Sequence, residues 1–214
     1  MTKIKICGLT RKRDIDAVNA VLPDYIGFVF TRSSRQICIE DAKALKSCLN
    51  PYIKAVGVFV DEEIENVVRL CSSHVIDLVQ LHGDENERYI KELKSCVPNK
   101  IIKAVRVRGP EDIKKAVDFS CDYLLFDTHH EGKYGGSGRT FDWSMIHNVS
   151  KPYFLAGGIN SGNVFQAIEQ CKPYCIDVSS GVETDGYKDP EKIMDIVTKV
   201  RGLKDKSPDK QQFS

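Results

Sequence analysis

The sequence lacks the signatures of several large classes of protein. No apolar run approaches the roughly 18 residues of a membrane-spanning helix, and residues 1–5 lack the apolar core of a signal peptide. No C-x-x-C pair, Walker lysine motif or G-x-G-x-x-G fingerprint occurs. We therefore expect no membrane association, no zinc site and no site for a nucleoside triphosphate or a dinucleotide.

The sequence also lacks an excess of charge of either sign. Its 31 basic and 30 acidic residues give a formal net charge of +1 over 214 residues. This balance provides no electrostatic footprint for nucleic acid or for an anionic membrane, so an anion would need a local site. Eight cysteines are present without a cluster of further metal ligands, and we expect reduced, buried thiols in a cytoplasmic protein.

What the sequence does contain is one repeated unit. Eight short apolar segments have the composition of β-strands, at residues 3–7, 25–30, 53–60, 77–82, 101–106, 123–127, 153–156 and 175–179. Apolar residues recur at helical spacing between them, at residues 11–22, 41–49, 61–71, 87–96, 110–117, 163–171 and 190–200. Such alternation, at intervals of about 20 to 30 residues, is typical of right-handed β-α-β units.

We expect eight strands to alternate with eight helical segments, seven of which have the ranges given above. This alternation predicts a single-domain α/β protein, a parallel (β/α)8 TIM barrel over residues 1–202. A doubly wound open sheet is the alternative. The first strand-to-helix turn has no dinucleotide fingerprint, however, and eight strands are many for that architecture. Residues 203–214 are polar, and we expect them to form a disordered tail.

In such a barrel the chemistry lies in the loops that follow the carboxyl ends of the strands. Cys7 ends the first predicted strand, and Gly8 lets the backbone turn away after it. A cysteine at a strand end is more often an apolar filler than a reactive group. The role of Cys7 therefore has to be judged together with the other loops at the same rim.

Glycine and hydroxyl residues follow the last two predicted strands, namely Gly157, Gly158, Ser179, Ser180 and Gly181. The loops after strands seven and eight of such barrels often bind phosphate through backbone N–H groups and a helix N-terminus. Glycines also serve simply to allow tight turns. Their presence in both loops, with two hydroxyls in the second, favours a phosphate site.

The most specific signal is the joint order of ten short motifs. They are Lys5-Ile6-Cys7-Gly8-Leu9-Thr10, Gly27-Phe28-Val29-Phe30, Ser33-Ser34-Arg35, Val56-Gly57-Val58-Phe59, Gln80-Leu81-His82-Gly83, Leu125-Phe126-Asp127-Thr128, Gly135-Gly136-Ser137-Gly138, Phe141-Asp142-Trp143, Leu155-Ala156-Gly157-Gly158-Ile159 and Asp177-Val178-Ser179-Ser180-Gly181-Val182-Glu183. Each is short, but in this order they resemble the phosphoribosylanthranilate isomerases of tryptophan biosynthesis.

The resemblance implies an Amadori rearrangement, in which N-(5-phosphoribosyl)anthranilate becomes 1-(2-carboxyphenylamino)-1-deoxyribulose 5-phosphate. It implies one small phosphorylated sugar-anthranilate substrate and no metal or organic cofactor, because the substrate nitrogen acts as the electron sink. We expect a monomer or a homodimer.

By the same resemblance, Asp127 is the general acid that protonates the furanose ring oxygen, and Cys7 is the base that removes the proton from C2. Arg35 resembles the family's arginine for the anthranilate carboxylate, and a guanidinium fork suits a planar carboxylate. His82 and Asp177 are expected to bind substrate, Asp177 through the sugar hydroxyls. A structural role is the alternative for each of these last two residues.

Lys5 lies on the Cys7 side of the strand alternation, one rung deeper in the barrel. It is a candidate for the cation that lowers the pKa of the thiol. The alternative is that Lys5 reaches the opposite mouth of the barrel and serves stability. The glycine loop 135–138 is expected to be a mobile cover, and the two histidines of the insert 129–134 to lie in a solvated loop rather than at a metal.

Two rival functions stand beside the isomerase. The sugar isomerase of histidine biosynthesis runs the same rearrangement in the same fold, but it has an aspartate where this chain has Cys7, and it shows a half-barrel repeat that we do not see here. A barrel that binds phosphorylated sugars without turnover would need neither Cys7 nor Asp127. The presence of both residues favours the isomerase.

Overall fold

The computed structural model describes residues 1–128 and 140–202. Eight parallel strands close into a barrel in chain order: β1 (Lys3–Cys7), β2 (Tyr25–Val29), β3 (Lys54–Phe59), β4 (Leu78–Leu81), β5 (Lys100–Val107), β6 (Tyr123–Thr128), β7 (Tyr153–Leu155) and β8 (Cys175–Val178). β8 pairs with β1, where Asp177 lies beside Lys5, and this pairing closes the sheet. The structure confirms the predicted TIM barrel and rules out an open doubly wound sheet.

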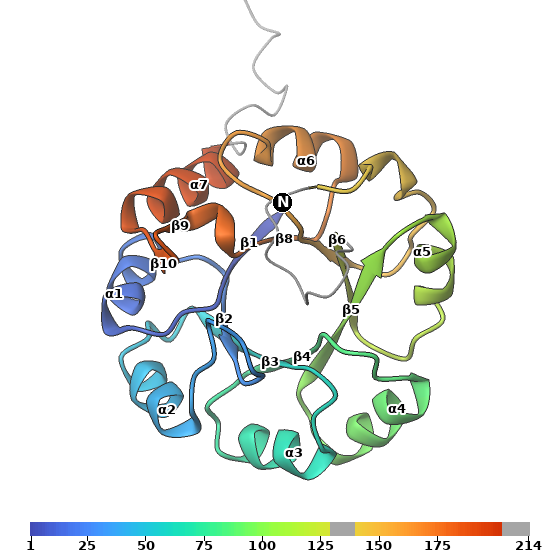
Figure 1. Ribbon diagram of the computed structural model, residues 1–214, viewed down its shortest axis with the longest axis horizontal. Helices are drawn as coiled ribbons and strands as arrows, with labels where there is room; N and C mark the ends of the chain where they lie inside the picture. Colours follow the sequence, from blue (N-terminus) through green and yellow to red (C-terminus); the bar gives the residue numbers. More distant parts are fainter. Residues whose placement is uncertain (129–139, 203–214) are drawn as a thin grey trace, which may run out of the picture.

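Seven α-helices of the described residues surround the barrel (Figure 1): α1 (Lys12–Val21), α2 (Ile39–Ser47), α3 (Ile64–Ser72), α4 (Glu87–Cys96), α5 (Pro110–Ala116), α6 (Val164–Cys171) and α7 (Pro190–Gly202). The prediction of eight helical segments is wrong for this part of the chain. In the described part of the connection between β6 and β7, residues 140–152, the helical element is the 3-10 turn η1 (Trp143–Met145). Asp142 accepts a hydrogen bond from the backbone N–H of Ser144, and Asn148 has a φ of +56°, so both residues favour turns over a longer helix.

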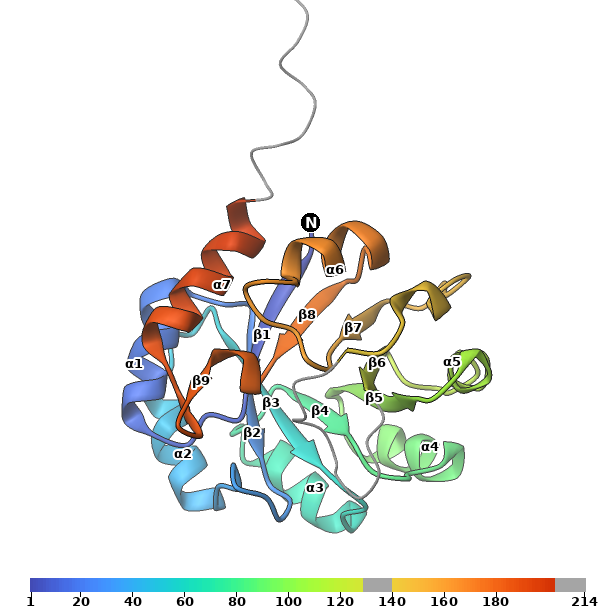
Figure 2. The same ribbon diagram turned by 45° about the horizontal axis from the view of Figure 1, so that its top comes forward.

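A small hairpin that the sequence did not reveal follows β8. The 3-10 turn η2 (Ser180–Val182) leads into β9 (Glu183–Thr184) and β10 (Tyr187–Lys188), which pair antiparallel. The hairpin lies beside α1 and α7 (Figure 2), and Arg11 donates a hydrogen bond to the carbonyl oxygen of Lys188. Strands of two residues are too short to produce a period-two pattern in the sequence.

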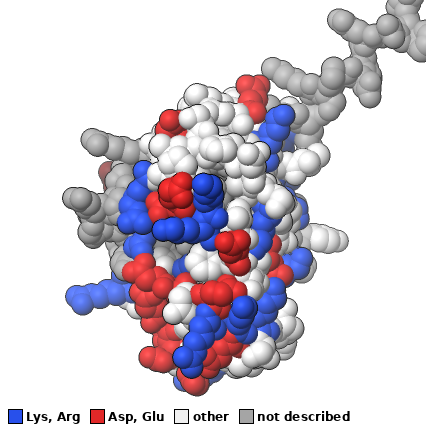
Figure 3. Space-filling view, turned by 90° about the vertical axis from the view of Figure 1, so that its right-hand side faces the viewer, with Lys and Arg blue, Asp and Glu red and all other residues white. Residues whose placement is uncertain are grey.

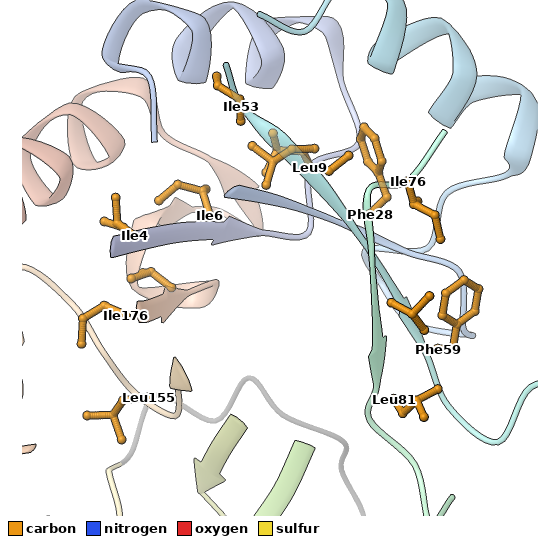
Figure 4. Close-up of a cluster of buried hydrophobic side chains, with 14 of the residues drawn as sticks. Ile4, Ile6, Leu9, Phe28, Ile53, Phe59, Ile76, Leu81, Leu155 and Ile176 are labelled. Atoms are coloured by element: carbon orange, nitrogen blue, oxygen red, sulfur yellow. The ribbon is translucent and has the colours of Figure 1, made fainter. Parts of the chain in front are cut away.

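Apolar side chains fill two layers of the molecule. Outside the strands, a large cluster that includes Ile4, Ile6 and Phe28 packs beneath the helices (Figure 4). Inside the barrel lies a smaller cluster formed by Tyr25, Val56, Leu78, Ile102, Ala104, Tyr123, Leu125, Phe154, Ala156 and Cys175. The alternation predicted for β1 is confirmed, because Ile4 and Ile6 pack outward while Lys5 and Cys7 face the interior.

All eight cysteines are free thiols, but only five of them are buried. Cys38, Cys48 and Cys96 are exposed, so the prediction that the thiols are buried is wrong for these three. Each lies at an end of α2 or α4, where the helix reaches the surface. The buried thiols include Cys7.

Charged side chains of both signs are interleaved on the side of the molecule where α4 and α5 lie (Figure 3). Arg108 pairs there with Asp112, and Lys114 with Glu111. On this side of the molecule, positive and negative side chains offset one another, in agreement with the formal net charge of +1. No helix among the described residues is long and apolar enough to cross a membrane.

Three expectations concern segments outside the described residues. They are the polar tail 203–214, the glycine loop 135–138 and the histidine-containing insert 129–134. These expectations stay predictions.

Candidate active site

A cavity of about 540 Å³ opens at the carboxyl ends of the strands. Nine of the ten predicted site residues line it: Cys7, Arg35, His82, Asp127, Gly157, Gly158, Asp177, Ser179 and Ser180. Gly181 does not line the cavity but belongs to the same loop as Ser180. A second hollow, of about 810 Å³, lies at the amino ends of the strands and contains none of these ten residues. The fold therefore brings residues from distant parts of the chain together at one mouth of the barrel.

Cys7 ends β1, and its thiol occupies a tight space. A Cβ atom added at Gly27 on the neighbouring strand would lie 2.6 Å from the Sγ of Cys7, so a larger residue there would displace the thiol. Burial raises the pKa of Cys7 above its ordinary value, while the positive charges of Lys5 and Lys188 act to lower it. The charge of Lys5 does act to lower this pKa, as predicted, but burial outweighs it, so the pKa of Cys7 lies above its ordinary value.

Lys5 lies fully buried in the middle of the barrel. Its Nζ donates hydrogen bonds to Oδ2 of Asp177 and to Oε1 of Gln80, both at 2.8 Å. Burial acts to lower the pKa of Lys5, but the negative charges of Asp177 and Cys7 outweigh it and raise this pKa above its ordinary value. Lys5 is thus a cation placed beneath the thiol, and the alternative placement at the opposite mouth is wrong.

Asp177 carries an unused acceptor in the cavity. Its Oδ2 accepts from Lys5, whereas its Oδ1 is buried and has no hydrogen-bond partner among the described residues. A buried carboxylate oxygen without a partner is costly to folding. Because Asp177 lines the cavity, this oxygen is positioned to accept a hydrogen bond from a ligand hydroxyl.

Asp127 is held at the end of β6 by two neighbours. The backbone N–H of Thr128 donates to its Oδ1 at 2.7 Å, and Nε2 of His82 lies 3.3 Å from its Oδ2. The other ring nitrogen of His82, Nδ1, lies 2.9 Å from Nε2 of Gln80. His82 therefore contacts a predicted catalytic residue directly, besides lining the cavity.

Arg35 is fixed by a residue far away in the sequence. Its Nε and one terminal nitrogen donate to the two carboxylate oxygens of Glu183, both at 2.7 Å. A Cβ atom at Gly8, which has a φ of +85°, would lie 2.5 Å from Cδ of Arg35, so glycine allows this close approach. A guanidinium has five N–H donors, and the pair with Glu183 uses two of them. The other three have no partner among residues 1–128 and 140–202, and Arg35 lines the cavity, where an anion could accept from them.

Lys188 approaches the same ion pair from β10. Its Nζ bonds to Oε1 of Glu183 and to the carbonyl oxygen of Ser179, the latter at 3.0 Å. Burial lowers the pKa of Lys188 below its ordinary value, although Glu183 acts in the opposite direction. The side chain thus ties the β9–β10 hairpin to the loop after β8.

The two glycine loops pack against each other and against β6. Gly157 has a φ of +82°, and a Cβ atom there would lie 2.6 Å from the backbone nitrogen of Thr128. A Cβ atom at Gly181 would lie 2.0 Å from the carbonyl oxygen of Ile159, in the loop after β7. Glycine is required at both positions for the loops to approach this closely. Their backbone borders the cavity near the start of α6, an arrangement suited to an anion such as phosphate.

Sequence reasoning missed Glu183 and Lys188 as parts of this site, and it treated Gln80 only as a neighbour of His82. Glu183 stood inside one of the motifs that carried the resemblance, but neither it nor Lys188 has a local pattern that assigns it a role. Among residues 1–128 and 140–202, no group of three or more His, Cys, Asp or Glu residues is arranged to hold a metal ion. The expected absence of a cofactor stays a prediction.

Comparison with known proteins gives consistent results. Residues 4–199 match the family model described as N-(5'-phosphoribosyl)anthranilate (PRA) isomerase. A protein of Endomicrobium trichonymphae with the name N-(5'-phosphoribosyl)anthranilate isomerase is 47% identical over 203 residues, covering 95% of this chain and 100% of that protein.

Solved structures of similar proteins agree. The crystal structure of phosphoribosyl anthranilate isomerase from Thermotoga maritima matches with a TM-score of 0.86 and 36% identity, over 95% of this chain and 100% of that one. A phosphoribosyl anthranilate isomerase in complex with reduced 1-(o-carboxyphenylamino)-1-deoxyribulose 5-phosphate matches with a TM-score of 0.83 and 35% identity, over the same shares of the two chains.

Proposed function

The chain belongs to the N-(5'-phosphoribosyl)anthranilate isomerase family, and from this premise we propose that Cys7 and Asp127 are the base and the acid of its reaction. The protein is an isomerase of tryptophan biosynthesis, which converts the aldose N-(5-phosphoribosyl)anthranilate to the corresponding ketose, 1-(2-carboxyphenylamino)-1-deoxyribulose 5-phosphate. The observation that carries the proposal is the cavity that both side chains line, from strands β1 and β6.

The reaction needs two proton transfers, one at the furanose ring oxygen and one at C2, which are both bonded to C1. Asp127 gives a proton to the furanose ring oxygen, the bond between that oxygen and C1 breaks, and the electron pair of the anthranilate nitrogen forms an iminium with C1. The thiolate of Cys7 then removes the proton from C2, and those electrons form the C1=C2 bond of an enamine as the iminium electron pair returns to the nitrogen. The C2 hydroxyl of this enamine loses its proton and C1 gains one, with no net change in protons, which gives the ketose. At the end of one turnover Asp127 has lost a proton and Cys7 has gained one, so both must be reset before the next.

The remaining contacts fit the two charged ends of such a substrate. The free N–H groups of Arg35 would bind the anthranilate carboxylate, and the loops of Gly157, Gly158 and Ser179 to Gly181 would bind the phosphate through backbone N–H groups. Oδ1 of Asp177 would accept from a sugar hydroxyl. A substrate held at both ends in this way would have its C1 and C2 atoms between Cys7 and Asp127, which both line the cavity.

The test is the fluorescence decay of enzymatically generated phosphoribosylanthranilate after the protein is added. We expect a rapid decay with the wild-type protein and a drop of at least about 10²-fold in kcat for Cys7→Ala and for Asp127→Asn. Cys71→Ala is the matched control, because Cys71 is also buried but lies outside the cavity. Wild-type rates in either site variant, with the fold confirmed by circular dichroism, would contradict the proposed roles.

Cytoplasmic location and a monomeric or homodimeric state are further parts of the proposal. One similar structure is described as that of generated monomers of the dimeric phosphoribosylanthranilate isomerase from Thermotoga maritima. Sedimentation equilibrium of this chain distinguishes the two states. Cell fractionation tests the location, and recovery of the protein with the membrane fraction would contradict it.

A further inference from the structure

A chain of side-chain contacts crosses the barrel interior from Lys5 to Asp127. Nζ of Lys5 donates to Oε1 of Gln80 at 2.8 Å, and Nε2 of Gln80 lies 2.9 Å from Nδ1 of His82. Nε2 of His82 then lies 3.3 Å from Oδ2 of Asp127. Gln80 is only 1% exposed, so no bulk water competes for its amide group. None of the roles proposed so far uses Gln80.

Elementary hydrogen-bond chemistry fixes the direction of every bond in this chain. A lysine ammonium has donors only, so the amide oxygen of Gln80 must face Lys5, and the amide NH₂ must face His82. An NH₂ group donates and cannot accept, so Nδ1 of His82 must be the acceptor. A neutral imidazole that accepts at Nδ1 carries its proton on Nε2, and this N–H points at Asp127.

The same contacts disfavour the other forms of the histidine. A proton on Nδ1 would face the NH₂ group of Gln80, donor against donor. Turning the amide over would relieve that clash but would bring its NH₂ group against the ammonium of Lys5. Lys5 cannot easily withdraw, because it is fully buried and also bonded to Oδ2 of Asp177 at 2.8 Å.

We propose that Gln80 is a positioning residue that keeps His82 in its neutral Nε2–H form, so that His82 donates to Asp127 once the carboxyl has given up its proton. The inference rests on the proposed function, because the Nε2–H donor of His82 contributes to catalysis only if Asp127 is the acid. The charge of Lys5 polarises the amide and, through it, the imidazole. The carboxylate left on Asp127 therefore has a hydrogen-bond donor that is in place before the reaction begins.

Other charged groups surround the same cavity and also affect how the protonation of the His82 ring depends on pH. They are Cys7, Arg32, Arg35, Asp127 and Asp177, which line the cavity, Lys5 beneath it, and Arg106 on β5, which lies beside Asp127 in the sheet and pairs with Asp84. Only Gln80 and Asp127 are shown in contact with the two ring nitrogens of His82 among the described residues. Substitution of Gln80 therefore changes the partner of Nδ1 and leaves that of Nε2 in place.

The first test is the state of the His82 ring in long-range ¹H–¹⁵N spectra at pH 7, with the signal assigned by its loss in His82→Asn. We expect the neutral Nε2–H form in the wild-type protein. Gln80→Glu, which is nearly isosteric, accepts from both Lys5 and a protonated Nδ1, so its ring should carry both protons. A wild-type ring that is doubly protonated, or neutral with its proton on Nδ1, would overturn the proposal.

The second test is activity against pH. A doubly protonated His82 in Gln80→Glu would still donate to Asp127, but its positive charge would favour the carboxylate over the acid that has to give the proton. We therefore expect kcat of Gln80→Glu to fall roughly tenfold or more at neutral pH with little change in KM, and to recover as rising pH removes the additional proton from the His82 ring. Gln170→Glu, on the exposed side of α6, adds the same charge as a control and should behave as the wild type. A Gln80→Glu profile that matches the wild type would overturn the positioning role.

The two tests separate this inference from the proposed function. The spectra report the form of the ring whatever the protein catalyses. If the wild-type ring is in the expected form but Asp127→Asn retains full activity, the role of Asp127 fails and the structural assignment of Gln80 stands. If Asp127→Asn is inactive and the ring is in another form, only the positioning role fails.

Discussion

The two mouths of this barrel use similar side chains in different ways. At the amino ends of the strands, Tyr25 and Tyr174 share a hydrogen bond of 3.0 Å, and Lys3 lies over both rings at 5.5 and 5.3 Å. Lys100 donates to the hydroxyl of Tyr123 at 3.3 Å. These polar groups satisfy one another at the edge of the interior.

The carboxyl ends are arranged differently. Oδ1 of Asp177 has no partner among the described residues. The thiol of Cys7 is buried, and burial disfavours its ionised form and so raises its pKa. Buried polar groups left without partners cost stability, and they persist where a ligand is expected to satisfy them. The contrast indicates that the amino end serves stability and the carboxyl end serves chemistry.

The largest expected effect is the loss of stability when Lys5, the buried cation beneath the carboxyl-end cavity, is replaced. Lys5→Met leaves the carboxylate of Asp177 buried without its cation, and we expect the free energy of unfolding to fall by roughly 3 to 5 kcal/mol in urea titrations. Lys100→Met removes a lysine from the other mouth, where the side chain is exposed, and should change stability little. Equal losses in the two variants would break the distinction between the mouths.

The next effect concerns the glycine loops. Gly157→Ala places a Cβ atom 2.2 Å from Oγ1 of Thr128 at a φ of +82°, so we expect a loss of roughly 1 to 3 kcal/mol in stability together with a higher KM. Gly202→Ala is the control, because no atom lies within 4 Å of its added Cβ. An unchanged KM in Gly157→Ala would show that these loops do not shape the phosphate site.

A smaller effect is expected from the ion pair that holds Arg35. Glu183→Gln weakens the two charge-assisted bonds to the guanidinium, and we expect KM to rise roughly tenfold while kcat changes less. Glu111→Gln removes an equal charge from the exposed surface of α5 as a control. A fall confined to kcat would indicate that Glu183 acts on Cys7 through Lys188 rather than on substrate binding.

The smallest effect belongs to the amino mouth. Tyr174→Phe removes the hydroxyl that bonds to Tyr25, and we expect a loss of about 1 kcal/mol in the free energy of unfolding. Steady-state rates should stay within twofold of the wild type. A large fall in kcat would contradict the assignment of this mouth to stability alone.

The sequence predicted the parts of the fold that have a strong local pattern. The alternation of β1 placed Lys5 and Cys7 on the interior side, and the structure confirms it. The strand ends agree with the prediction to within a residue or two, because Gly8, Gly83 and Gly157 follow β1, β4 and β7 closely. The position of the cavity was predicted by the fold, because the active sites of such barrels lie at the carboxyl ends of the strands.

The sequence could not predict contacts that depend on long-range closure. Arg35 and Glu183 lie 148 residues apart, and their pairing becomes visible only when β8 meets β1. The chain from Lys5 to Gln80 likewise spans 75 residues and crosses the barrel interior. The two-residue strands β9 and β10 have no periodicity of their own, so Lys188 had no predicted place.

The most direct test of the account is to measure kcat/KM and the alkylation rate of Cys7 by iodoacetamide across the same range of pH. Both are measured in a protein whose exposed Cys38, Cys48 and Cys96 are replaced by serine. Because the active form has Cys7 ionised and Asp127 protonated, we predict that kcat/KM against pH is bell-shaped. One of its limbs should share its midpoint with the alkylation of Cys7, whose pKa burial raises above the ordinary value of a thiol. A kcat/KM that stays flat through the alkylation midpoint would contradict Cys7 as the base.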